Sequence, residues 1–127
     1  MTSKYYIILF SILLLFPNFS TKIKTPATCA DALANAHKTY DAAKKGISAD
    51  EIEYLHKYAQ RTMDAATATK QAATECHCHA KWTVEDATKA YEYAQKALQQ
   101  DTFRVARKLL KKAKFYADNS IADAEDC

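Results

Sequence analysis

The segment TECHCHAKW (residues 74–82) contains two of the four cysteines of this 127-residue chain. Four side chains that can form disulfides or bind metal ions follow one another in it: Cys76, His77, Cys78 and His79. The remaining cysteines, Cys29 and Cys127, lie at nearly equal distances before and after this segment. This spacing predicts two halves of similar length, each with a cysteine at either end.

The two halves align with each other, without gaps, when the chain is shifted against itself by 51 residues. The first set of matched apolar positions is Leu33/Val84, Ala36/Ala87, Tyr40/Tyr91, Ala43/Ala94 and Ile47/Leu98. The second set is Ile52/Phe103, Leu55/Ala106, Ala59/Leu110, Ala66/Ala117 and Ala73/Ala124. Identity is low, so chance similarity between alanine-rich helices is one explanation. Because the register ends with Cys76 on Cys127, we favour an internal duplication.

Apolar residues within each half recur after three or four positions, which is the spacing of one face of an α-helix. We therefore predict four helices, near residues 29–45, 49–76, 84–99 and 102–126. A single glycine and a single proline after residue 20 argue against a loop-rich all-β fold. Short connections favour antiparallel neighbours. The predicted fold is all-α, with two disulfide-stapled antiparallel α-hairpins forming a four-helix up-down bundle.

Polar side chains predict where the helices begin and end. Three pairs combine a capping hydroxyl with a carboxylate three residues later: Thr28/Asp31, Ser48/Glu51 and Thr83/Asp86. Asp101 is the predicted cap of the fourth helix, and Gly46 is predicted to end the first.

The first 20 residues predict a secretory signal peptide. Lys4 precedes an apolar run from Tyr5 to Phe16, which Pro17 closes. This run is shorter than the roughly 20 apolar residues that span a bilayer. We predict a signal at residues 1–20 and a single helical domain at 21–127, with hairpin one near 29–76 and hairpin two near 78–127. The expected location is secreted or periplasmic, and a retained N-terminal membrane anchor is the alternative.

An even number of cysteines behind a signal peptide predicts disulfides. The pairs Cys29–Cys76 and Cys78–Cys127 would each close one hairpin, and each could stabilise the fold by about 4 kcal/mol. The crossed pairing, Cys29–Cys78 with Cys76–Cys127, stays open because the two central cysteines only exchange partners.

The same central segment also carries ligands that suit zinc or copper. Four consecutive residues rarely surround one ion tetrahedrally, so a site would combine its histidines with His37 or with a second chain. We expect no metal ion and no other cofactor. The alternative is an extracytoplasmic copper- or zinc-binding protein with ligands from the following set: His37, Cys76, His77, Cys78 and His79.

The stretch RVARKLLKKAKFY (residues 104–116) is basic and contains no acidic residue. Its cations are Arg104, Arg107, Lys108, Lys111, Lys112 and Lys114. Apolar residues such as Val105 and Leu109 are interleaved with them. A basic amphipathic helix can bind anionic lipid or another acidic surface. The alternative is an ordinary solvated helix face, since acidic residues follow from Asp118 onwards.

Catalysis finds little support in the sequence. No glycine-rich phosphate loop, nucleophile elbow or metalloprotease motif occurs. A net charge of only +3 argues against nucleic-acid binding. We therefore expect a small exported, non-catalytic protein that binds or scaffolds an unidentified protein or envelope partner. Membrane contact would come from an uncleaved signal or from the basic helix at 104–114.

Overall fold

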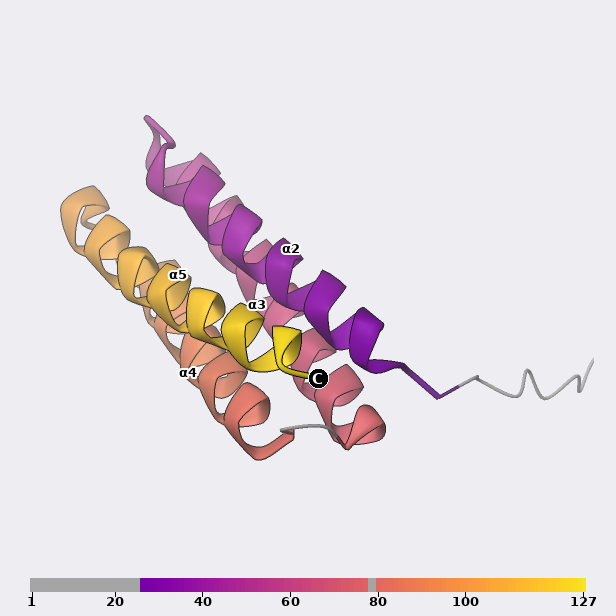
Figure 1. Cartoon of the computed structure of the whole chain (residues 1–127). Coiled ribbons are helices and arrows are strands. Elements are labelled where there is room, and N and C mark those ends of the chain that lie inside the picture. The colour runs from indigo at the N-terminus through magenta and orange to yellow at the C-terminus, as the bar shows by residue number, and fades with distance from the viewer. Residues whose placement is uncertain (1–25, 78–79) are drawn as a thin grey trace, which may run out of the picture.

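The structure is a computed structural model that describes residues 26–77 and 80–127. Helices are the only regular secondary structure in these two ranges (Figure 1). They are α2 (Cys29–Ile47), α3 (Ile52–Cys76), α4 (Ala80–Leu98) and α5 (Phe103–Glu125). The prediction of an all-α fold is confirmed for the residues that the structure describes. The predicted signal at residues 1–20 lies outside the described residues.

Each of the four helices packs against two neighbours. α2 and α4 each contact both α3 and α5 extensively. The diagonal pairs, α2 with α4 and α3 with α5, barely touch. The turns at 48–51 and 99–102 lie at one end of the molecule, and the C-terminus lies at the other, near the start of α2 (Figure 1). Consecutive helices therefore run in opposite directions, which is the neighbour pattern of an up-down arrangement.

Alanine dominates the interior. The buried apolar residues are nearly all alanine, and Leu55 and Leu110 are the largest side chains that are fully buried. Buried threonines fill further positions. The hydroxyl of Thr39 donates to the Asn35 carbonyl at 2.9 Å and lies 3.3 Å from the hydroxyl of Thr69 on α3. Because each alanine buries only one methyl group, the apolar core contributes less per residue than a leucine-rich core would.

The shift of 51 residues also matches helix boundaries and buried positions of the two halves. α2 and α4 each have 19 residues, and their first residues, Cys29 and Ala80, are equivalent in this register. Buried positions correspond in the same way, as in the pairs Ala36/Ala87, Ala43/Ala94, Ala59/Leu110 and Thr69/Ser120. The register therefore describes helix boundaries and burial as well as sequence.

The predicted caps are correct at one helix of four. Thr28 and Asp31 form the expected capping box at α2. Ser48 instead ends α2, where its hydroxyl donates to the Lys44 carbonyl at 3.1 Å, and α3 begins without a side-chain cap. At α5 the capping position is Thr102 rather than Asp101, again without a side-chain hydrogen bond.

The predicted start of α4 and the predicted end of α2 are wrong because packing overrides them. α4 begins at Ala80, so Thr83 lies inside the helix and is 1% exposed. Gly46 does not end α2, which continues to Ile47. Gly46 is needed for close approach, since a Cβ there would collide with the Leu110 side chain and would lie 3.0 Å from the Cβ of Tyr58.

Candidate functional site

A disulfide joins Cys29, the first residue of α2, to Cys76, the last residue of α3. Their Cα atoms are 5.2 Å apart, within the usual range for such a bond. Nearby, the backbone amide of Ala27 donates to the Glu75 carboxylate at 2.6 Å. One of the two predicted pairs is therefore confirmed, and it closes hairpin one at its open end. A structural disulfide indicates an oxidising, extracytoplasmic environment.

The second predicted pair, Cys78–Cys127, cannot be followed in the same way because Cys78 and His79 lie outside the described residues. Cys127 is exposed and ends the chain after α5. Figure 1 shows this terminus at the end of the molecule where α3 finishes. Cys127 is thus at the same end of the molecule as the Cys29–Cys76 bond.

The alternative metal ligands are dispersed where the structure describes them. Cys76 is bonded to Cys29 and offers no thiolate. His77 is exposed and adopts a left-handed conformation (φ 59°) that terminates α3. His37 is exposed on α2. Within residues 26–77 and 80–127, no three histidine, cysteine or acidic side chains are close enough to hold a metal ion.

The outer surface of α5 is the most distinctive feature of the described chain. Arg104, Lys108 and Lys111 are exposed at intervals of four and three residues, and Phe115 follows four residues later. This spacing aligns the four side chains along one side of the helix. Phe115 is 60% exposed. We call these four residues the α5 outer face.

Other predicted cations of this helix take different positions. Lys112 is exposed beside the α5 outer face, 5.3 Å from the ring centre of Tyr93 on α4. Arg107 is half-buried: it donates to the Ala49 carbonyl at 3.1 Å and lies 4.4 Å from the Phe103 ring centre. Lys114 is also half-buried, above the Tyr40 ring. Arg107 and Lys114 therefore join helices, whereas the remaining cations face solvent.

A shallow groove runs beside the α5 outer face, between α2 and α5. It is lined by Tyr40, Ile47, Lys111, Lys114, Phe115 and Asp118. The Phe115 ring meets the Tyr116 ring edge-on, with centres 5.3 Å apart. Phe115 thus contacts Tyr116 while most of its surface stays exposed. Sequence analysis did not select Phe115, although its spacing from Lys111 already placed it on the polar side of the helix.

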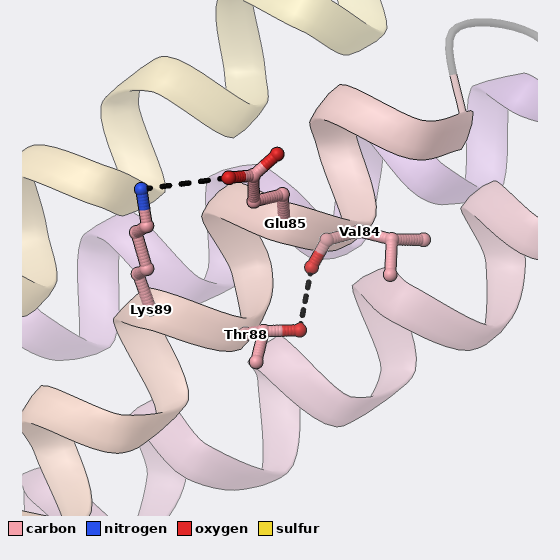
Figure 2. Close-up of polar contacts among 4 residues, drawn as sticks. All are labelled: Val84, Glu85, Thr88 and Lys89. Carbon is pink, nitrogen blue, oxygen red and sulfur yellow. Dashed lines mark hydrogen bonds and ion pairs between the residues drawn. The ribbon is translucent and has the colours of Figure 1, made fainter.

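Tyrosines of α4 and α5 contact each other and nearby lysines. Tyr93 and Tyr116 stack with centres 5.6 Å apart. Lys89 lies 5.2 Å from the Tyr116 ring centre and pairs with Glu85 at 3.7 Å. Figure 2 shows this ion pair beside the hydrogen bond from Thr88 to the Val84 carbonyl, 2.6 Å long. These rings join α4 to α5.

Two carboxyl groups meet between α4 and α5. Asp86 was predicted to cap α4, but it lies inside the helix and interacts with Asp123 of α5. Burial first, and then a hydrogen bond and the charge of Asp123, raise the pKa of Asp86 to about 6. Oδ2 of Asp123 is buried without a hydrogen-bond partner among the described residues, so a proton on Asp86 supplies a donor that the Asp123 carboxylate lacks.

The 51-residue register explains why this pair is unusual. The positions equivalent to Asp86 and Asp123 in hairpin one hold Asn35 and Ala72. Ala72 is buried there in an alanine cluster. Hairpin two therefore places a carboxylate where hairpin one has a methyl group. Comparing the two halves would have revealed Asp123, which the pattern of helix caps did not.

The chain has no match among protein-family models, curated proteins or solved structures. None of the helices in the described ranges is long and apolar enough to cross a membrane.

Proposed function

We propose that the protein is a small exported, non-catalytic binding protein that recognises an anionic partner through the α5 outer face and Lys112. Its framework would be two α-hairpins that arose by duplication, each closed by one disulfide, packed as a four-helix up-down bundle. The Cys29–Cys76 bond and the matching helix boundaries of the two halves support this framework. The position of Cys127 at the end of the molecule where α3 finishes is consistent with the pair Cys78–Cys127.

The observation that carries the binding proposal is the charge and exposure of α5. Between residues 104 and 114 the helix holds six cations and no acid, and the exposed ones occupy its solvent side. Each exposed lysine or arginine near an anionic surface contributes about 1 kcal/mol to binding. Three together would change the affinity by roughly two orders of magnitude.

The acidic residues of the same helix follow its cations, and Asp118 lines the groove together with Lys111. Asp118 is one turn beyond Phe115, and the others lie in the last turns near the C-terminus. The exposed cations of α5 therefore lie in the half of the helix that begins at the 99–102 turn. A partner would approach this half, and the cysteine-rich end would remain outside the contact.

The test is a comparison of two triple variants with the same net charge. The first is Lys108→Gln/Lys111→Gln/Lys112→Gln, and the control is Lys38→Gln/Lys57→Gln/Lys81→Gln. All six lysines are exposed, and the control residues lie on α2, α3 and α4. Binding to a phosphate-bearing polyanion matrix is measured by the salt concentration that elutes each protein. We expect early elution of the first variant only, and equal elution of both would contradict the proposal.

A further inference from the structure

The α5 outer face combines charge with an exposed aromatic ring in a way that narrows the kind of anionic partner. Phe115 is 60% exposed and continues the line of Arg104, Lys108 and Lys111. Leaving such a ring in water is unfavourable, since its burial is worth about 1.5–3 kcal/mol. An apolar side chain at the end of a row of cations is expected where the partner has both an anionic layer and an apolar interior.

The shape of this surface points in the same direction. The four residues follow the convex side of a helix, and the groove beside them is shallow and partly occupied by the Lys114 side chain above Tyr40. A small molecule or a rigid peptide would find few enclosing walls. A bilayer interface is deformable, and it accepts a convex amphipathic helix with its ring at the level of the lipid headgroups.

Lysine geometry fits this partner as well. Lysine stems can lie along apolar surface while their ammonium groups remain with phosphate groups. Lys108 and Lys111 are three residues apart, within one turn of the helix. Phe115 lies about one turn beyond Lys111. The cations and the ring can therefore contact one layer of headgroups at the same time.

We infer that the α5 outer face binds an anionic lipid bilayer, with Arg104, Lys108 and Lys111 at the phosphate groups and the Phe115 ring inserted between lipids. This inference rests on the proposed function and names its partner. Burial of part of one ring, together with three cations, gives reversible surface binding rather than permanent anchorage.

The native tryptophan makes a direct test possible. Trp82 is 57% exposed in the first turn of α4. It lies near the acidic end of α5, because Asp86, one turn after it, interacts with Asp123. The variant Trp82→Phe/Phe115→Trp moves the fluorophore to the α5 outer face. Both forms are prepared as residues 21–127, oxidised, so that the predicted signal does not contribute to membrane binding.

The two proteins are mixed with phosphatidylglycerol vesicles or with phosphatidylcholine vesicles. We expect the emission of tryptophan at position 115 to shift to the blue with phosphatidylglycerol only, and to be quenched by brominated acyl chains. The emission of Trp82 in the unchanged protein should not shift. An unshifted signal at position 115 on sedimenting vesicles would overturn the insertion of the ring.

Binding strength provides a second, independent measurement. Phe115→Ser should weaken sedimentation with phosphatidylglycerol vesicles by about tenfold, which corresponds to partial loss of one buried ring. Tyr54→Ser is the matched control, because Tyr54 is a 55% exposed aromatic residue on α3. Equal binding by both variants and the parent protein would overturn the inference.

The outcomes separate this inference from the proposed function. Salt-sensitive retention on the polyanion matrix without binding to vesicles would leave the proposed function intact and refute the bilayer as the partner. Failure to bind either the matrix or the vesicles would refute both.

Discussion

Replacing Asp86 with asparagine should stabilise the protein near neutral pH. The pKa of Asp86 is raised to about 6, because the group is partly buried and faces the Asp123 carboxylate. In the unfolded chain the same carboxyl group titrates near 3.8. The folded state therefore binds a proton more tightly, and the free energy of unfolding falls as pH rises between about 4 and 6.

The size of this effect follows from the shift. The pKa of Asp86 differs by about two between the folded and the unfolded state, which corresponds to at most about 3 kcal/mol of unfolding free energy. Glu85 and Lys89 also act on Asp86 with opposite signs, and the carboxyl group is partly open to solvent, so screening reduces the contribution. We expect Asp86→Asn to raise the free energy of unfolding by about 1 kcal/mol at neutral pH. Asparagine is also the equivalent residue in hairpin one, at position 35.

The assay is urea unfolding followed by circular dichroism, at several pH values from about 4 to 7. The variant should lose most of the pH dependence of the parent protein in this interval. Asp31→Asn is a control of opposite sign, because hydrogen bonds from Thr28 lower the pKa of Asp31 and stabilise its charged form. Asp31→Asn should therefore destabilise the protein at neutral pH. A variant Asp86→Asn that is less stable than the parent at neutral pH would refute the reasoning.

Three further predictions concern packing and the covalent framework. Cys29→Ala/Cys76→Ala should lower the free energy of unfolding, measured with urea, by about 4 kcal/mol on the chain-entropy model. A loss below about 1 kcal/mol would mean that the unfolded chain is not restrained by this bond. Gly46→Ala should destabilise the protein by about 1–3 kcal/mol through overpacking, although alanine favours helices. Ala97→Gly, at the equivalent position, should lower the free energy of unfolding by about 1 kcal/mol, because glycine loses more conformational entropy in a helix than alanine. A Gly46→Ala variant that is more stable than the parent protein would contradict the packing. Arg107→Ala should lower the free energy of unfolding by about 1–2 kcal/mol, because the Ala49 carbonyl loses its donor. The same variant should leave vesicle binding nearly unchanged. A loss of binding as large as that of the triple lysine variant would contradict the structural role of Arg107.

Sequence periodicity was sufficient for the number, type and approximate extent of the helices, because alanine and threonine recur at helical spacing through both halves. Cysteine spacing was sufficient for the Cys29–Cys76 pair. The helix starts were harder to predict. Thr83 and Asp86 match a capping box, but α4 begins before them because Thr83 fits a buried position equivalent to Ala32.

The functional residues, too, could be predicted from the sequence only in part. The cations of α5 are evident from composition alone, but their separation into exposed and helix-joining groups depends on contacts such as that of Arg107 with the Ala49 carbonyl. Exposure of Phe115 could have been inferred from its spacing to Lys108 and Lys111. The interaction of Asp86 with Asp123 depends on how α4 and α5 pack, which local patterns do not specify.

The pairing of the four cysteines is the most direct test of the two-hairpin framework. Tryptic digestion without reduction should yield one cluster of three peptides, at residues 25–38, 71–81 and 115–127, since no lysine or arginine separates Cys76 from Cys78. Backbone fragmentation at His77, with the disulfides intact, then assigns the partners. We predict that the fragment with Cys76 carries peptide 25–38 and that the fragment with Cys78 carries peptide 115–127. Exchanged partners, or cysteines that can be alkylated before reduction, would contradict the account.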